Sequence, residues 1–300
     1  MTAAALLLPD RAYASTDGGR KKVAVVLSGG GAKGMAHIGA LRVIEKAGIP
    51  IDIITGTSMG SIVGGLYAIG YDAHRLDSMV RVQDWSFLLT DKLEAHSPLL
   101  DNRERQNTYF LTKTFTLSKN KITNKQGGMI EGRNLDKLFN RLTAGYRDSI
   151  DFNSLPIPFA CVATNIVDNS EYVMHSGVLS EAMRSSMAIP GVFSPVRKDS
   201  MVLVDGGLRN NFPVDIARQM GADVVIGVTV QEDLKSAYDL KSTSDVLMQI
   251  VNINCKNKYD ENLAMTDVPI CVNTSGYSSA SFTASAIDTL MNRGEEAAMR

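Results

Sequence analysis

The chain has 300 residues, 44% of them hydrophobic, and its 31 lysines and arginines nearly balance 32 aspartates and glutamates, for a formal net charge of −1. This length can bury a sizeable core, as one large domain or two small ones. A near-neutral charge spread along the chain argues against a nucleic-acid binder that neutralises phosphates. No stretch reaches the roughly 20 apolar residues that a membrane span needs.

The cysteines exclude two further classes of protein. Cys161, Cys255 and Cys271 form no CxxC pair and lie far apart in the sequence, so they predict neither a zinc site nor a disulfide framework. Cys161 belongs to the apolar run PFACVAT, and we expect it to be a buried structural thiol.

The first residues are similar to the end of a signal peptide. The segment TAAALLLPDRAYA has a short apolar core and ends in an A-x-A pattern at 12–14, although no positively charged segment precedes it. We expect residues 1–21 to be an unstructured leader or the remnant of a signal peptide. Export to the periplasm or outer membrane is then the expected location, with a cytoplasmic location as the alternative.

Strands and helices alternate from Lys22 onward, which predicts an α/β fold with a mostly parallel sheet. We expect strands at residues 23–27, 51–55, 159–163, 172–175, 201–204, 224–228 and 268–272. We expect helices at residues 35–47, 59–69, 133–145, 178–187, 213–220 and about 242–265. The last segment, IDTLMNRGEEAAMR, is typical of a helix cut in mid-course, so we expect one domain of a longer protein.

Residues 86–130 interrupt this alternation. Within them TYFLTKTFTLSKNKIT alternates in the manner of a β-hairpin. The region is expected to be an insertion outside the sheet. Its apolar stretches WSFLL and SPLL fit either a lid that touches a membrane or, as such residues do more often, part of the core.

The first glycine cluster, SGGGAKG, follows a strand and precedes a helix. Gly29, Gly31 and Gly34 satisfy the G-x-G-x-x-G pattern of dinucleotide-binding proteins. A Rossmann unit also needs an acidic residue at the end of its second strand, whereas Asp52 stands at the start. A phosphate-binding P-loop fails too, because Lys33 precedes Gly34 and no serine or threonine follows at the required place.

The second glycine cluster, GTSMG, predicts a nucleophile elbow. Ser58 stands at the tip of a strand-to-helix turn, with Gly56 and Gly60 two positions to either side, where side chains would collide with a neighbouring strand or the substrate. The helix N-terminus favours negative charge that develops there. The alternative interpretation of Ser58 is a helix N-cap.

A nucleophilic Ser58 gives the first glycine cluster a function. Acyl transfer passes through an oxyanion, which preorganised backbone amides stabilise. Gly29, Gly30, Gly31 and Gly34 are therefore candidates for the oxyanion hole, and in particular the amides of Gly30 and Gly31.

The candidate base is Asp205, in MVLVDGGLRNNFPVD. Mostly apolar residues lead to it, Gly206 and Gly207 form the turn after it, and Pro213 starts a helix. No histidine follows residue 175, which excludes a triad in the order Ser, Asp, His through Asp205. The simplest interpretation is a Ser58–Asp205 dyad, and the alternative is a structural aspartate that closes a turn.

One histidine-based alternative remains open. Asp168 and His175 flank a polar turn and could form a triad with Ser58. His37, on the helix after the glycine loop, is expected to be a packed or capping residue.

Taken in order, these motifs resemble the patatin-like phospholipase family. The resemblance rests on GGGAKG (29–34), GTSMG (56–60) and DGG (205–207), with SSMAIP (185–190) and NNFP (210–213) in the flanking pattern. It implies a three-layer sandwich with a mostly parallel central sheet, here over residues 22–300. It also implies a Ser–Asp dyad, a glycine-rich oxyanion hole, hydrolysis of acyl esters in lipids, commonly phospholipids, and no metal or other cofactor.

The resemblance also bears on partners. A lipid substrate implies peripheral contact with a membrane, and Lys33 would suit a lipid phosphate or, equally, carbonyls and solvent. The leader and the C-terminal helix are similar to bacterial members with a C-terminal outer-membrane domain, which the longer protein is then expected to carry. The rival functions are a nucleotide-binding Rossmann-type protein, a non-catalytic binding module on a hydrolase fold, and a peptidase or thioesterase with the same dyad.

Overall fold

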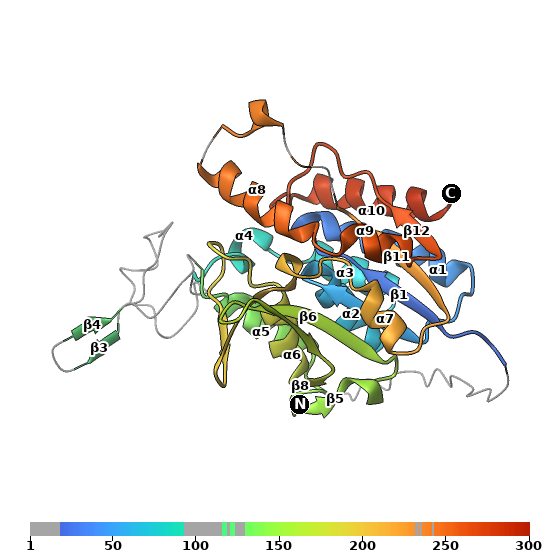
Figure 1. Cartoon of the computed structure of the whole chain (residues 1–300), viewed down its shortest axis with the longest axis horizontal. Coiled ribbons are helices and arrows are strands. Elements are labelled where there is room, and N and C mark those ends of the chain that lie inside the picture. The colour runs from blue at the N-terminus through green and yellow to red at the C-terminus, as the bar shows by residue number, and fades with distance from the viewer. Residues whose placement is uncertain are drawn as a thin grey trace, which may run out of the picture.

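The computed structural model describes residues 19–92, 116–118, 121–123, 130–231, 234, 236–241 and 243–300. Among these, eight strands form one sheet (Figure 1). Each strand is hydrogen-bonded to the next in the series β12 (Val268–Cys271), β11 (Val224–Thr229), β1 (Val23–Leu27), β2 (Ile53–Thr57), β6 (Phe159–Asn165), β10 (Met201–Asp205) and β9 (Val196–Lys198). β7 (Ser170–Met174) also pairs with β6. The strands from β12 to β6 are parallel, while β10 and β7 run antiparallel to β6.

Helices cover both faces of the sheet, because successive side chains of a strand point to opposite sides. Val25 and Leu27 pack into the larger core, whereas Ala24 and Val26 pack into a second one. The larger core takes most of its helical residues from α1 (Ala36–Lys46), α2 (Met59–Ala68), α3 (Ala73–Arg81), α5 (Arg133–Leu142), α6 (Leu179–Ser186) and α10 (Ala284–Ala298). The second core lies under α7 (Val214–Gln219) and α9 (Tyr259–Ala264). The expected three-layer α/β sandwich is confirmed.

The register of β6 places the ends of two strands together. β7 pairs with residues 161–165 of β6. β2 pairs Thr57 with Val162, and β10 pairs Asp205 with Ala163. Because β7 already occupies one edge at these positions, β2 and β10 must both lie along the other edge. They run toward each other, so the residue after Thr57 meets Asp205.

Most predicted elements are confirmed within a residue or two. The second strand begins at Ile53 rather than residue 51, since the Asp52 carboxylate accepts a hydrogen bond from the Val23 amide (2.7 Å) and caps the entry to the sheet. The predicted hairpin is confirmed as β3 (Thr116–Ser118) paired with β4 (Lys121–Thr123). The leader through residue 18 and most of the 86–130 insertion lie outside the described residues.

The single long helix predicted over residues 242–265 is wrong. The chain forms α8 (Thr243–Cys255) and then α9, separated by a turn in which Lys258 adopts the left-handed conformation (φ 57°). The Asn257 side chain donates to the carbonyl of Leu208 (3.1 Å), which ties this turn to the loop after Asp205. α3, the short α4 (Trp85–Leu88), β9 and the small pair β5 (Ile150–Asp151) and β8 (Ser176–Gly177) were not predicted.

No helix in the described ranges combines the length and apolar character needed to cross a membrane.

α10 packs directly on α1 through two glycines. A Cβ at Gly39 would lie 1.9 Å from the Met291 carbonyl oxygen, and one at Gly294 would lie 1.9 Å from the Ala36 carbonyl oxygen. A larger residue at either position would prevent α1 and α10 from packing this closely.

We expect Gly39→Ala and Gly294→Ala each to lower the free energy of unfolding by about 1–3 kcal/mol, because the helices must separate. Gly145→Ala is the matched control, since no atom lies within 4 Å of its added Cβ. Its effect should stay within about 0.5 kcal/mol. Urea titration followed by circular dichroism measures all three, and equal stabilities would contradict the glycine contact.

Candidate active site

Ser58 occupies the turn between β2 and α2 in a backbone conformation rarely adopted by residues other than glycine (φ 54°, ψ −122°). Such strain persists where the surrounding structure fixes it, often at active sites. The side chain is 4% exposed, and its Oγ donates a hydrogen bond to Oδ2 of Asp205 (2.7 Å). The N-cap alternative is not supported, since the Ser58 side chain accepts no hydrogen bond from α2. The structure therefore brings Ser58 and Asp205 into contact, as the sequence predicts.

Gly56 and Gly60 make the elbow possible. A Cβ at Gly60 would lie 2.1 Å from the carbonyl oxygen of Leu27 in β1, and one at Gly56 would lie 2.4 Å from the Gly60 carbonyl oxygen. The predicted collision with a neighbouring strand is thus confirmed for Gly60. At Gly56 the obstacle is the start of α2 itself.

Asp205 ends β10 and is held by the turn that follows. Its Oδ1 accepts a hydrogen bond from the Gly207 amide (2.8 Å), while Oδ2 accepts the one from Ser58. Gly206 lies against β6, where a Cβ would come within 2.1 Å of the Val162 carbonyl oxygen. Burial raises the pKa of Asp205 to about 6, against the smaller lowering effect of the Ser58 and Gly207 hydrogen bonds. A carboxylate with this pKa suits a general base near neutral pH.

The glycine loop divides into residues that could bind an oxyanion and residues that could not. Within the described part of the chain, the amides of Gly30 and Gly31 donate to no protein acceptor, and both residues line the pocket that contains Ser58. The Gly29 amide donates to the Asn211 carbonyl (3.1 Å), and Gly34 lies inside a 3₁₀ turn, where amides are used internally. Gly29 and Gly34 are therefore corrected from amide donors to residues that allow close packing.

Two residues of the site were quoted in sequence motifs without a role. Ser186, at the end of α6, accepts a hydrogen bond from the Ser58 amide (2.9 Å) and donates to the Val162 carbonyl (2.6 Å). Asn211, which is 5% exposed, donates to Gln231 Oε1 (2.7 Å), and its carbonyl accepts the Gly29 amide. Ser186 thus holds the elbow against β6, and Asn211 holds the glycine loop.

The structure does not support a histidine base for Ser58. His37 is buried, its Nε2 bonds to the Ser28 carbonyl (2.7 Å), and burial lowers its pKa to about 4. It is a packed, neutral residue, as expected. Asp168 accepts its hydrogen bonds from Asn165 and Ser170 and so closes its own turn. None of the hydrogen bonds found among the described residues joins it to His175.

The nucleotide alternative is not supported either. Asp52, which would have to hold a ribose, caps the start of the sheet and pairs with Arg20. Ser58 and Asp205 lie instead where the other ends of the parallel strands meet.

Cys161 is buried in the sheet, and burial raises the pKa of its thiol, as expected of a structural cysteine.

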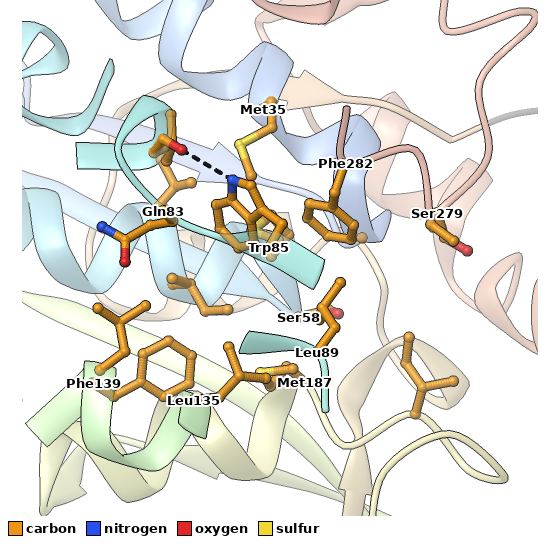
Figure 2. Close-up of a pocket in the computed structure, with 18 of the residues that line it drawn as sticks. Met35, Ser58, Gln83, Trp85, Leu89, Leu135, Phe139, Met187, Ser279 and Phe282 are labelled. Atoms are coloured by element: carbon orange, nitrogen blue, oxygen red, sulfur yellow. Dashed lines mark hydrogen bonds between the residues drawn. The ribbon is translucent and has the colours of Figure 1, made fainter. Parts of the chain in front are cut away.

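An apolar cavity of about 280 Å³ opens beside Ser58 (Figure 2). Its walls come from α1, α2, α3, α4, α5 and α8, from the loops after α4 and α6, and from the segment before α10, and they include Met59, Leu89, Phe139, Met187 and Phe282. Trp85 stacks on Phe282 with ring centroids 4.8 Å apart and donates its indole N–H to the Val80 carbonyl (2.9 Å). The WSFLL stretch therefore belongs to the cavity wall, whereas SPLL lies outside the described residues.

A second pocket, of about 180 Å³, meets the cavity at Ser58. It is more polar, with the glycine loop, Lys33, Asp205, Gln231 and Asn252 in its lining. Ser58 thus stands between an apolar space and a polar one, with a base on its hydroxyl and two amides nearby. This arrangement can carry out acyl transfer on a molecule with an apolar acyl part and a polar leaving group.

Residues 25–218 match the family model described as patatin-like phospholipase. Patatin-like phospholipase domain-containing protein 6 of Mus musculus is 36% identical over 227 residues, which are 75% of this chain and 14% of that protein. Lysophospholipase NTE1 of Meyerozyma guilliermondii is 31% identical over 213 residues, 69% of this chain and 12% of that protein. The crystal structure of VipD from Legionella pneumophila aligns with 94% of this chain and 66% of its own at a TM-score of 0.49 and 16% identity. The chain thus spans a small part of the curated relatives.

The pKa of Asp205 predicts how activity depends on pH. The base must be ionised, so kcat/KM for a soluble ester should rise with pH and level off above a midpoint of about 6. Asp205→Asn should lower kcat by about 10³-fold on the plateau at pH 8 and abolish the acidic limb, so the difference from wild type should shrink at low pH. A wild-type profile without an acidic limb would contradict Asp205 as the base.

Ionisation of Asp205 should also lower the free energy of unfolding at neutral pH. Its folded-state pKa lies above the unfolded value of 3.8, so the folded protein binds the proton more tightly and loses stability as pH rises from about 4 to 6. Asp205→Asn should remove this loss and be up to about 3 kcal/mol more stable at pH 7. A variant that is markedly less stable in thermal melts at pH 7 would indicate a purely structural aspartate.

Ser186→Ala tests the support of the elbow. It leaves the Ser58 amide without its acceptor, so we expect kcat to fall by about tenfold with KM unchanged, because orientation rather than binding is lost. Ser186→Thr keeps the hydroxyl and should recover part of kcat. Equal kcat values in all three proteins would contradict a positioning role.

Proposed function

This chain belongs to the patatin-like phospholipase family, and from that premise we propose that it is a lipid acyl hydrolase, a serine esterase of the phospholipase A or lysophospholipase type. The observation that carries the proposal is the position of the Ser58–Asp205 pair at the mouth of an apolar cavity. A hydroxyl with a base alone would fit many acyl transfers. The cavity restricts them to substrates with an apolar acyl chain.

The proposed reaction proceeds in two steps. Ionised Asp205 takes the proton of Ser58 as Oγ attacks the ester carbonyl, and the Gly30 and Gly31 amides bind the oxyanion. The intermediate collapses, the alcohol leaves with the proton from Asp205, and an acyl ester remains on Ser58. Asp205 then takes a proton from water, which attacks the acyl ester, and returns it to Ser58 as the fatty acid departs.

Burial of the acyl chain would drive substrate binding. Each buried methylene contributes about 0.8 kcal/mol, so the apolar cavity favours long chains over short ones. The polar leaving group would occupy the second pocket, beside Lys33 and Asn252. Peripheral contact with a membrane and export toward the periplasm or outer membrane belong to the same proposal.

The direct test is release of fatty acid from phospholipid and lysophospholipid dispersions, measured by mass spectrometry. We expect wild-type protein to release fatty acid and Ser58→Ala to release none above background. Folded wild-type protein that hydrolyses no lipid or soluble ester would contradict the proposal and favour a non-catalytic binding module.

The role of the cavity can be tested separately. Leu89 is partly exposed and lines the cavity, so Leu89→Trp should fill space there with little cost to the fold. We expect kcat/KM for a hexadecanoyl ester to fall at least tenfold while that for a butanoyl ester changes less than twofold. Leu234→Trp, at an exposed leucine outside the cavity lining, is the control. Equal losses on both esters would show that the cavity does not hold the chain.

A further inference from the structure

α8 covers the polar side of the active site. Met248, Val251, Asn252 and Cys255 recur at intervals of three and four residues, so they share one face of the helix, and all four line the pocket beside Ser58. The same helix contacts the turn after Asp205. Figure 1 shows α8 at the upper edge of the molecule. Access to the polar pocket is therefore bounded by this helix.

The outer face of α8 is apolar. Val246, Ile250 and Ile253 follow the same spacing half a turn away from the inner residues, and they are 46%, 51% and 51% exposed. A surface helix normally turns charged or polar side chains to water. Three aliphatic residues in that position form an exposed apolar stripe, a feature typical of interaction surfaces.

The charges around α8 indicate the kind of partner. Asp245 is the only charged residue between Thr243 and Cys255, whereas Lys241 precedes the helix and Lys256 follows it. Tyr238, in the segment before α8, is 89% exposed to solvent. An apolar stripe flanked by lysines suits the surface of a membrane, where cations attract anionic head groups and aromatic rings lie at the head-group level.

We propose that the outer stripe of α8, formed by Val246, Ile250 and Ile253, docks on the surface of a membrane that contains anionic lipids. The proposal rests on the proposed lipid hydrolase function. Docking of the outer face would hold the pocket on the inner face of α8 within about one helix diameter, roughly 10 Å, of the lipid surface. α8 is thus a docking element and one wall of the site at once.

A second copy of the chain is the competing occupant. Each partner in a standard protein interface buries roughly 800 Å², and three half-exposed aliphatic side chains provide much less. Insertion into a lipid surface needs no such area, because each buried side chain gains transfer free energy independently. The flanking lysines would repel their equivalents in a twofold pair but attract anionic head groups.

The test uses sedimentation with vesicles of phosphatidylcholine and phosphatidylglycerol at 4:1, and with pure phosphatidylcholine. The stripe variant is Val246→Asn/Ile250→Asn/Ile253→Asn, which keeps a similar helix propensity. The control variant, Ile49→Asn/Val268→Asn/Met299→Asn, removes three exposed apolar residues outside α8. Binding is measured in the Ser58→Ala background, so that hydrolysis does not alter the vesicles.

We expect the stripe variant to bind the mixed vesicles at least tenfold more weakly and the control variant to bind them as the parent does. With Ser58 restored, the stripe variant should lose vesicle hydrolysis by a similar factor and keep hydrolysis of a soluble butanoyl ester within twofold. Lys241→Gln should weaken binding to the mixed vesicles about fivefold and leave binding to pure phosphatidylcholine unchanged.

Three results would overturn the proposal: no binding of the parent protein to either vesicle, equal binding of the stripe variant, or equal loss in the control variant. Light scattering after size exclusion tests the competing occupant, since a mass halved in the stripe variant with vesicle binding retained would assign the stripe to a dimer. If the proteins bind vesicles as expected but hydrolyse no ester, the hydrolase proposal fails while the docking surface stands.

Discussion

The active site depends on two strands that end against each other along one edge of β6. β2 delivers Ser58 and β10 delivers Asp205, and the register of both strands on Val162 and Ala163 brings the two side chains within hydrogen-bonding distance. A slip of one residue in either strand would turn its side chains to the opposite face and separate the pair. Glycines accompany both turns: Gly56 and Gly60 flank Ser58, and Gly206 and Gly207 follow Asp205.

The same geometry sets the electrostatics of Asp205, the proposed base. Asp205 is buried because β6 and the glycine turns surround it, and burial opposes its ionisation. Two hydrogen bonds, from Ser58 and Gly207, partly offset this effect. With a pKa of about 6, Asp205 is about nine-tenths ionised at pH 7 yet basic enough to take a proton. A more exposed carboxylate would be ionised but a weaker base.

The sequence predicted what depends on local chain geometry. A strand, a glycine-flanked serine and a helix define an elbow, so Ser58 could be assigned, and the DGG turn after an apolar strand identified Asp205 in the same way. The roles of Ser186 and Asn211 arise from contacts with residues more than a hundred positions away, which no local pattern encodes. The distinction between Gly29 and Gly30 also rests on such a contact.

The apolar cavity and the break between α8 and α9 escaped prediction for related reasons. The cavity is lined by residues from six α-helices and several loops, and in each segment these residues are indistinguishable from ordinary core. The helix breaks at Lys256–Lys258 without the glycine or proline that usually marks an end, because a contact from Asn257 to the loop after Asp205 fixes the turn.

The central claim is that Ser58, activated by Asp205, is the nucleophile. A fluorophosphonate probe followed by peptide mass spectrometry tests it most directly, since the probe reacts covalently only with an activated serine. The account predicts modification of Ser58 in the wild-type protein, none in Ser58→Ala, and a sharp decrease in Asp205→Asn. Failure of the folded wild-type protein to react, even with liposomes present, or reaction at a different serine, would contradict it.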